Sequence, residues 1–299
     1  MKLFIISQKG ILQISSPFIK KRNLVSAASF LLILTSSLLV SCNTKHETAT
    51  SDESDINATV EVRTEQEDIR IETAKNIIQE AVSKSGLSGF NSAAVSFRFR
   101  DKEYRYQRNA GKFRYERWWQ DTVSGQRIRD ILTNTGLTRF IDGQEVDLPD
   151  KKRRAYGNSV NSVIYFAFMP WVLTDPAVIP VYEGQENIKG EVLDRVRVGF
   201  EEENGGSDNK DEFLYWFSAE TRQLKYLAYS HPGGAMPRFR VANNERTVDG
   251  ITVRDYHNYT TADKSARTID KLSQDYQEGK LMLLSEINLE EVQVVSIID

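Results

Sequence analysis

Residues 93–117 read AAVSFRFRDKEYRYQRNAGKFRYER, and apolar or aromatic side chains stand at every second position along most of this stretch. A period of two is typical of a β-strand with one face toward a core and the other toward solvent. Polar residues interrupt the pattern twice, so it predicts three short strands joined by turns. The inward positions are Val95, Phe97 and Phe99, then Tyr104 and Tyr106, then Phe113 and Tyr115.

The same alternation recurs along the rest of the chain. Asp142-Gly143 is a strong signal for a tight hairpin, and Asp249-Gly250 precedes a further apolar alternation. In all we expect about nine to eleven strands in an antiparallel meander, and the lack of a repeat excludes a propeller or a solenoid. The apolar residues that mark the other expected strands are Phe140, Val146, Val196, Val198, Phe200, Phe213, Tyr215, Phe217, Leu224, Tyr226, Ala228, Phe239, Val241, Ile251, Val253, Leu289, Val292 and Val294.

Three segments have helical spacing instead. Apolar residues share one face over 74–82, 156–168 and 262–276, and Gly86, Pro170 and Gly279 follow as stop signals. Helices and strands together predict an α+β protein. We expect a single curved antiparallel sheet, forming an unclosed barrel, with a few helices as a lid.

Composition and charge limit the classes of function. The chain has 299 residues, 39 Lys+Arg against 42 Asp+Glu, and a net charge of -3, which excludes a basic nucleic-acid binder. One Cys and three His leave little for metal or thiol chemistry. We therefore expect no metal and no cofactor.

The N-terminal region has the order of a secretory signal. A basic cluster at 20–22 precedes an uncharged, apolar segment at 24–38, and Leu39-Val40-Ser41-Cys42 resembles a bacterial lipobox. An incidental cysteine is the alternative. We expect residues 1–41 to be cleaved after Ser41, Cys42 to be acylated, 42–72 to form an acidic flexible tether, and 73–299 to fold. We therefore expect an exported protein that is anchored by lipid in the outer membrane. The sequence leaves open whether it lies on the periplasmic face or on the outer face.

Several motifs resemble those of an uncharacterised family of Bacteroidota lipoproteins. They are Tyr165–Pro176, Asp211–Phe217, Tyr226–Ser230, Asn244–Ile251 and Asp255–Tyr259, and the resemblance covers residues 73–295. In architecture the domain is also similar to the lipoprotein-carrier fold of LolA and LolB. That resemblance implies an unclosed antiparallel barrel around an apolar cavity, and it leaves function open.

A curved sheet with an aromatic inner face and few covering helices leaves an apolar pocket wherever its side chains do not fill the concavity. Such a pocket suits a lipid or an acyl chain. The alternative is a fully packed core, in a structural lipoprotein that binds another envelope protein through its loops. The candidate lining residues are Phe97, Phe99, Tyr106, Phe113, Tyr115, Phe213, Tyr215 and Phe217, with Phe168, Met169 and Trp171 at the lid.

Two local clusters allow other contacts. Trp118 and Trp119 are adjacent on a strand, so they point to opposite faces, and an exposed one suits a partner or a membrane interface. The basic run Lys151–Arg154 could contact phosphates, although we expect a solvated loop before a helix.

Catalytic motifs are missing from the sequence. It has no Gly-x-Ser-x-Gly elbow, no His-Glu-x-x-His and no phosphate-binding glycine loop, and His231 and His257 have no partner that spacing identifies. The acidic run 208–212 lacks the ligand spacing of a calcium loop, so we expect a hairpin tip there. The sequence therefore predicts a binding protein and not an enzyme, with an unrecognised hydrolase as the remaining alternative.

Overall fold

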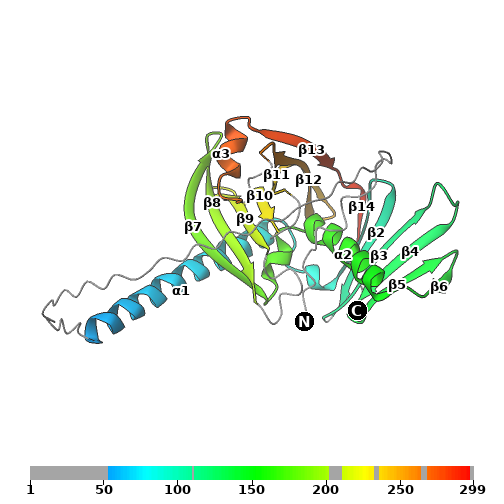
Figure 1. Ribbon diagram of the computed structural model, residues 1–299, viewed down its shortest axis with the longest axis horizontal. Coiled ribbons are helices and arrows are strands. Elements are labelled where there is room, and N and C mark those ends of the chain that lie inside the picture. Colours follow the sequence, from blue (N-terminus) through cyan, green and yellow to red (C-terminus); the bar gives the residue numbers. More distant parts are fainter. Residues whose placement is uncertain (1–52, 110, 202–210, 232–235, 264–267, 297–299) are drawn as a thin grey trace, which may run out of the picture. The chain divides into compact units, whose positions relative to one another are not determined.

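The computed structural model is built mainly from two seven-stranded antiparallel sheets (Figure 1). It describes residues 53–109, 111–201, 211–231, 236–263 and 268–296, with backbone alone over 53–63. The described residues from Gln66 onward belong to one compact unit. The helices are α1 (Glu53–Lys84), α2 (Asp150–Ala167) and α3 (Leu272–Gln277), with short 3-10 turns η2 (Phe90–Ser92) and η3 (Trp171–Thr174).

Each sheet is a meander in sequence order, apart from one strand. Sheet A has the order β14-β1-β2-β3-β4-β5-β6, and sheet B has the order β13-β12-β11-β10-β9-β8-β7. The last strand therefore returns to pair with the first. Sheet A comprises β1 (Ala93–Phe99), β2 (Lys102–Asn109), β3 (Lys112–Gln120), β4 (Arg127–Thr133), β5 (Gly136–Ile141), β6 (Gln144–Val146) and β14 (Glu290–Ser296). Sheet B comprises β7 (Val178–Ile188), β8 (Glu191–Phe200), β9 (Glu212–Ser218), β10 (Leu224–Ser230), β11 (Arg238–Val248), β12 (Ile251–Thr261) and β13 (Leu281–Ile287).

The predicted α+β class with an unclosed antiparallel sheet is confirmed, and the details differ. The described chain has fourteen strands instead of the nine to eleven expected, and they form two sheets instead of one. The strands that the pattern did not predict are β4, β7 and β13. β4 has a polar residue, Asp130, at an inward position, β7 contains Pro180 and Gly184, and β13 begins with four apolar residues in a row. Each of these departs from simple alternation.

The helices also differ from their expected limits. α1 begins at Glu53 instead of Thr73, so residues 53–72 of the predicted tether are helical; the stretch has no Gly or Pro to end a helix. The run Lys151–Arg154 lies in the first turns of α2 and not in a loop before it. Pro149 precedes that helix as its N-cap, and proline is compatible with a helix start. α3 covers only the last part of the predicted segment 262–276.

Alternation along β9 shows how the core is divided. Phe213, Tyr215 and Phe217 belong to one buried cluster, and Leu214 and Trp216 belong to a second cluster. Because neighbouring side chains on a strand point to opposite faces, sheet B is covered on both sides. The first cluster also holds the buried face of α1 and most of the inward residues of sheet A, whereas α3 contributes Leu272 to the second.

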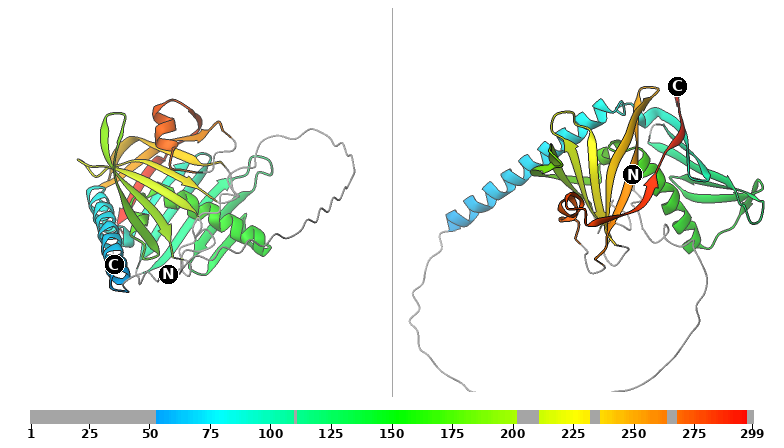
Figure 2. Two further views of the ribbon diagram at one scale, coloured as in Figure 1. Left: turned by 60° about the vertical axis from the view of Figure 1, so that its left-hand side comes forward. Right: turned by 90° about the horizontal axis from the view of Figure 1, so that it is seen from above.

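The inner face of sheet A changes from aromatic to ionic along one cross-strand row. The row runs Phe97, Tyr104, Arg117, Asp130, Arg139 from β1 to β5. Asp130 is fully buried and accepts hydrogen bonds from both guanidinium groups, including one of 2.7 Å from Arg139 Nε. α2 packs on β3, β4 and β5 (Figure 2), where its Ser159 Oγ accepts from Arg117 Nη1 at 2.8 Å. The ionic group of Arg117, Asp130 and Arg139 is therefore part of the surface that α2 packs against.

The end of α1 is fixed against the β11–β12 hairpin. Thr252 N donates to Ser85 O at 2.8 Å. Gly86 follows with a φ of 68°, and a Cβ at this position would lie 1.9 Å from Gly250 O. Both the backbone angle and the close approach therefore require glycine.

We expect Gly86→Ala to lower the free energy of unfolding by about 1–3 kcal/mol more than Gly111→Ala does, because added atoms in a packed contact force the backbone apart. Gly111 is the matched control: its φ is 79°, and nothing lies within 4 Å of a Cβ there. Both substitutions carry the cost of a left-handed residue. Urea unfolding of the two variants measures the difference, and equal losses would show that the contact with Gly250 is unimportant.

Candidate ligand-binding site

The candidate site begins with an aromatic group on sheet A. Tyr106 is fully buried on β2, and its ring centroid lies 4.5 Å from that of Phe90, 5.0 Å from Phe168 and 5.3 Å from Tyr115. Trp171 of η3 meets the rings of Phe90 and Tyr106 edge-on at 5.3 and 5.8 Å. The segment after α2 therefore closes over the inner face of sheet A.

A second aromatic group faces it from sheet B. Phe213 lies 5.8 Å from Tyr229 and 6.3 Å from Tyr165 of α2, measured between ring centroids. Phe166 extends this second group, 5.3 Å from Tyr165 and 5.3 Å from Tyr229. Rings from both sheets and α2 thus form one continuous apolar cluster, which we call the inner cluster.

The structure brings every predicted lining residue to this inner cluster. Phe99 and Phe113 pack against it while partly exposed, and the other nine are buried within it: Phe97, Tyr106, Tyr115, Phe168, Met169, Trp171, Phe213, Tyr215 and Phe217. Many of the rings contact one another directly. Their role in holding a ligand stays a prediction.

Sequence reasoning missed several members of the inner cluster. Phe90 lies in the short η2 turn, where no period marks it, and Tyr165 and Phe166 lie on α2 outside the predicted stripe. Tyr229 lies in one of the family motifs and not among the predicted lining residues. The run Tyr165–Met169 is almost wholly apolar, and that continuous hydrophobicity was the available signal.

Three of the hydroxyl groups inside the inner cluster are paired with one another or with the backbone. Tyr106 Oη donates to Phe90 O at 2.8 Å, and the hydroxyls of Tyr165 and Tyr215 lie 3.1 Å apart. Burial raises the pKa of Tyr115 to about 12. These tyrosines are therefore neutral, and the interior offers hydroxyls and no phenolate charge.

A titratable pair lies at one end of β9 and β10. Nδ1 of His231 forms a hydrogen bond with Oδ1 of Asp211. Asp211 is buried, with 5% of its surface exposed. Burial raises the pKa of Asp211 to about 6, and His231 acts in the opposite direction. Residues 208–210 of the acidic run 208–212 lie outside the described residues, so the hairpin tip expected there stays a prediction.

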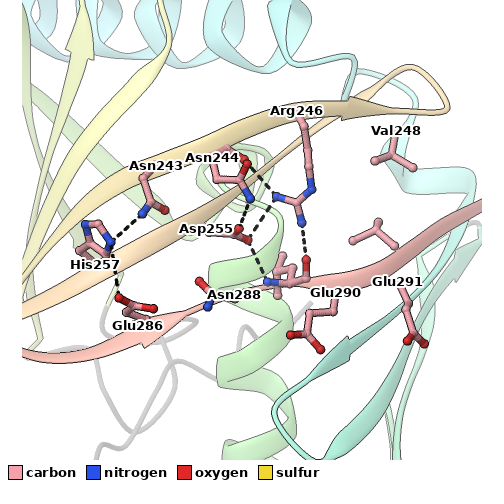
Figure 3. Close-up of a pocket in the computed structure, with 12 residues that line it drawn as sticks. Asn243, Asn244, Arg246, Val248, Asp255, His257, Glu286, Asn288, Glu290 and Glu291 are labelled. Atoms are coloured by element: carbon pink, nitrogen blue, oxygen red, sulfur yellow. Dashed lines mark hydrogen bonds and ion pairs between the residues drawn. The ribbon is translucent and has the colours of Figure 1, made fainter.

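A polar pocket of about 490 Å³ lies beside the β11–β12 hairpin and the β13–β14 connection (Figure 3). Asp255 is its central buried group. It accepts hydrogen bonds from Asn244 Nδ2 at 2.6 Å, Leu289 N at 2.8 Å and Arg246 Nη1 at 3.2 Å. Arg246 also donates to Leu289 O. Because Leu289 connects β13 to β14, this network fixes the chain where it passes from sheet B to sheet A.

Nearby, His257 Nε2 lies 2.9 Å from Asn243 Nδ2 and 3.9 Å from Glu286 Oε1. Among the residues that the structure describes, no three His, Cys, Asp or Glu side chains are grouped so as to hold a metal ion. The hydrogen bonds of Asp255 join the β11–β12 hairpin to the β13–β14 connection.

We expect Asp255→Ala to lower the free energy of unfolding by about 2–4 kcal/mol. The substitution leaves Arg246 without its carboxylate partner and the buried N–H of Leu289 without its acceptor. Glu290→Gln is the control from the same pocket. Glu290 pairs at 2.9 Å with Arg98, and both side chains are at least 40% exposed, so the loss there should stay below about 1 kcal/mol. Chemical denaturation compares them; similar losses would contradict the central role of Asp255.

The remaining sequence candidates are the tryptophan pair and the two residues of the predicted cleavage and lipidation site. Trp118 and Trp119 are both partly exposed, and Trp119 has Lys102 and Arg117 within 5.3 Å of its ring centroid. Ser41 and Cys42 lie outside the described residues. No helix in the described part of the chain combines the length and the hydropathy needed to cross a bilayer.

Comparison with solved structures gives several similar chains. A LolA superfamily protein from Nitrosomonas europaea is 12% identical with a TM-score of 0.42, over 76% of this chain and 94% of that one. A putative outer membrane lipoprotein-sorting protein domain from Vibrio parahaemolyticus is 8% identical with a TM-score of 0.39, over 70% and 99%. The lipoprotein LppX of Mycobacterium tuberculosis is 11% identical with a TM-score of 0.23, over 52% and 88%. No curated protein matches the sequence.

A family profile matches residues 29–289, which is most of the chain. The expected resemblance to a family of uncharacterised proteins is therefore confirmed. That the family consists of Bacteroidota lipoproteins stays a prediction. The chain belongs to the family of unknown function DUF6503.

Proposed function

We propose that this protein is a non-catalytic binding protein of the cell envelope that holds a hydrophobic ligand, a lipid or an acyl chain, in the inner cluster. The supporting observation is that one apolar cluster joins the inner faces of both sheets and is covered by α2 and η3. A ligand enters by separating rings that now contact one another, such as Phe168 from Tyr106. The apolar surface freed in this way matches an acyl chain.

The proposal includes a lipid anchor at Cys42. The basic cluster, the apolar segment and the lipobox-like Leu39–Cys42 support it. Removal of residues 1–41 takes away five basic and no acidic side chains, so the exported chain is more acidic than the full one. Anionic headgroups then repel it, and acyl chains hold it independently of charge.

Native mass spectrometry of the gently purified protein tests the binding directly. The proposal expects additional mass that dissociates as lipid. Protein that is consistently free of ligand, and that takes up no added fatty acid, would overturn it.

The position of the ligand can be tested with two tryptophans on different faces of the structure. Trp171 belongs to the inner cluster, whereas Trp216 is fully buried in the second cluster, on the other face of sheet B. A brominated fatty acid quenches a tryptophan only on contact. We therefore expect Trp171→Phe to remove most of the quenching and Trp216→Phe to leave it nearly unchanged.

The two substitutions are matched because each replaces a buried indole by a smaller ring. Circular dichroism confirms that both variants fold. Quenching that persists in Trp171→Phe, or that is lost equally in both, would place the acyl chain elsewhere.

The anchor has its own test. We expect Cys42→Ser to move the protein from the membrane fraction to the soluble fraction of the cell, because the thioether to the lipid cannot form. Ser41→Ala is the control, since a small residue before the cysteine is retained. A Cys42→Ser protein that still sediments with membranes would contradict anchoring at this residue.

A second candidate function is that of an interaction protein with a fully packed core. The observation that favours it is the edge strand β13, where Met282, Leu283 and Leu284 are 52%, 53% and 47% exposed. An exposed apolar edge can pair with a strand of another envelope protein. A ligand-free native mass combined with a stable protein complex would favour this function.

A further inference from the structure

Arg240 is a buried cation on the inner face of sheet B. It lies on β11, in register between Leu227 of β10 and Asn258 of β12. The residue is 5% exposed. Its Cζ stands 3.7 Å from the ring centroid of Phe166 and 5.2 Å from that of Tyr229, so the guanidinium group borders the inner cluster.

The hydrogen-bonding capacity of this guanidinium is largely unused. Nη2 donates to Tyr229 Oη at 2.8 Å, while Nε and Nη1 are buried without a partner among the residues that the structure describes. An arginine remains charged in a protein and carries five N–H donors. Burying such a charge without compensation costs several kcal/mol, so a complementary group is expected.

Three other buried arginines show what compensation by a carboxylate looks like in this protein. Asp130 lies between Arg117 and Arg139, and Arg254, which is 2% exposed, bonds to Glu245 at 2.9 Å. By contrast, none of the carboxylates that the structure describes forms an ion pair with Arg240.

A second cation adds to the imbalance. Arg238 precedes Arg240 by two residues on the same face of β11 and is 6% exposed. Its Nη1 donates to the carbonyls of Met236 and Pro237 and to Thr260 Oγ1, all of them neutral. Burial, together with the positive charge of Arg240, lowers the pKa of Arg238. Two like charges thus share one buried region.

The neighbouring strand β12 supplies further unpaired polar atoms. Within the described part of the chain, Tyr256 Oη and Asn258 Oδ1 are buried without hydrogen-bond partners, and Asn258 stands opposite Arg240. The Tyr256 hydroxyl can donate, and Asn258 can accept from a protonated group. These atoms and the free N–H groups of Arg240 form a polar site at the border of an apolar cluster.

We infer that Arg240 binds the oxyanion of an amphiphilic ligand, a carboxylate or a phosphate headgroup, whose hydrocarbon chain lies in the inner cluster. The inference rests on the proposed function and adds the charge of the ligand to it. An oxyanion has several acceptor oxygens, so it can take up the separate N–H groups of Arg240 and the Tyr256 hydroxyl at once. Phe166 and Tyr229 contact the guanidinium and belong to the inner cluster, so head and chain sites are continuous.

The first experiment needs only the purified full chain. Calorimetric titration compares hexadecanoate with methyl hexadecanoate, which has the same chain and no charge. We expect hexadecanoate to bind at least about tenfold more tightly, as for hydrogen bonds to a charged group. Equal affinity of the two probes would overturn the inference while leaving hydrophobic binding intact.

The second experiment assigns the preference to Arg240. Arg240→Met keeps the length of the side chain and removes its charge, so the preference for hexadecanoate should disappear while methyl hexadecanoate still binds. Arg105→Met is the matched control, because Arg105 is exposed on β2 and the net charge changes equally. A preference that survives in Arg240→Met, or that falls equally in both variants, would overturn the assignment.

Two further probes distinguish the source of the oxyanion. Tighter binding of hexadecyl phosphate than of hexadecanoate would support a phosphate headgroup, and the reverse would support a carboxylate.

Inorganic phosphate alone separates the oxyanion site at Arg240 from the proposed lipid binding. If neither lipid binds but phosphate raises the melting temperature of the wild type and not of Arg240→Met, the oxyanion site stands and the proposed lipid binding fails. If neither lipid nor phosphate binds, both fail.

Discussion

Burial of aromatic side chains on the inner faces of the two sheets is the constraint on which the structure depends. A strand buries only every second side chain on one face, and the phenylalanine and tyrosine rings of β1, β2, β3 and β9 all lie on the same side. Such a face is stable only when another layer covers it. α2 and η3 supply that layer through Tyr165, Phe166, Phe168 and Trp171, and α1 adds its own apolar face. The sequence between the two sheets therefore acts as their common cover.

Polar groups inside this interior are treated in two different ways. Asp130 is enclosed by two guanidinium groups and supports α2, so the charge there is balanced within the protein. At β11 the balance is missing, because Arg238 and Arg240 are buried with neutral partners only, among the residues that the structure describes. The Asp130 group is therefore a structural ionic group, whereas the β11 region can accept an external anion. In our proposal the headgroup site on β11 and the apolar inner cluster lie on the same face of sheet B.

The β13–β14 connection holds the two sheets together by a different means. Asp255 collects three N–H donors, one of them from the backbone of Leu289, at the point where the chain leaves sheet B for sheet A. Directional hydrogen bonds are suited to this position, because the short connection between β13 and β14 has no paired strand among the described residues to hold its backbone in place. The resulting polar pocket is therefore a consequence of topology.

The sequence by itself determined the α+β class, most strands, the inward aromatic positions and the end of α2 before Pro170, because periodicity and turn residues act locally. It did not determine β4, β7 or β13, whose patterns include a buried Asp130, a proline and an edge run, nor the start of α1 at Glu53. Only the tertiary structure decided that the strands divide into two sheets, that Phe90 and Phe166 join the inner cluster, and that Arg240 is buried with no carboxylate partner among the described residues. Those properties depend on contacts between residues far apart in the chain, and no local pattern encodes which strand an arginine will face or what will cover it.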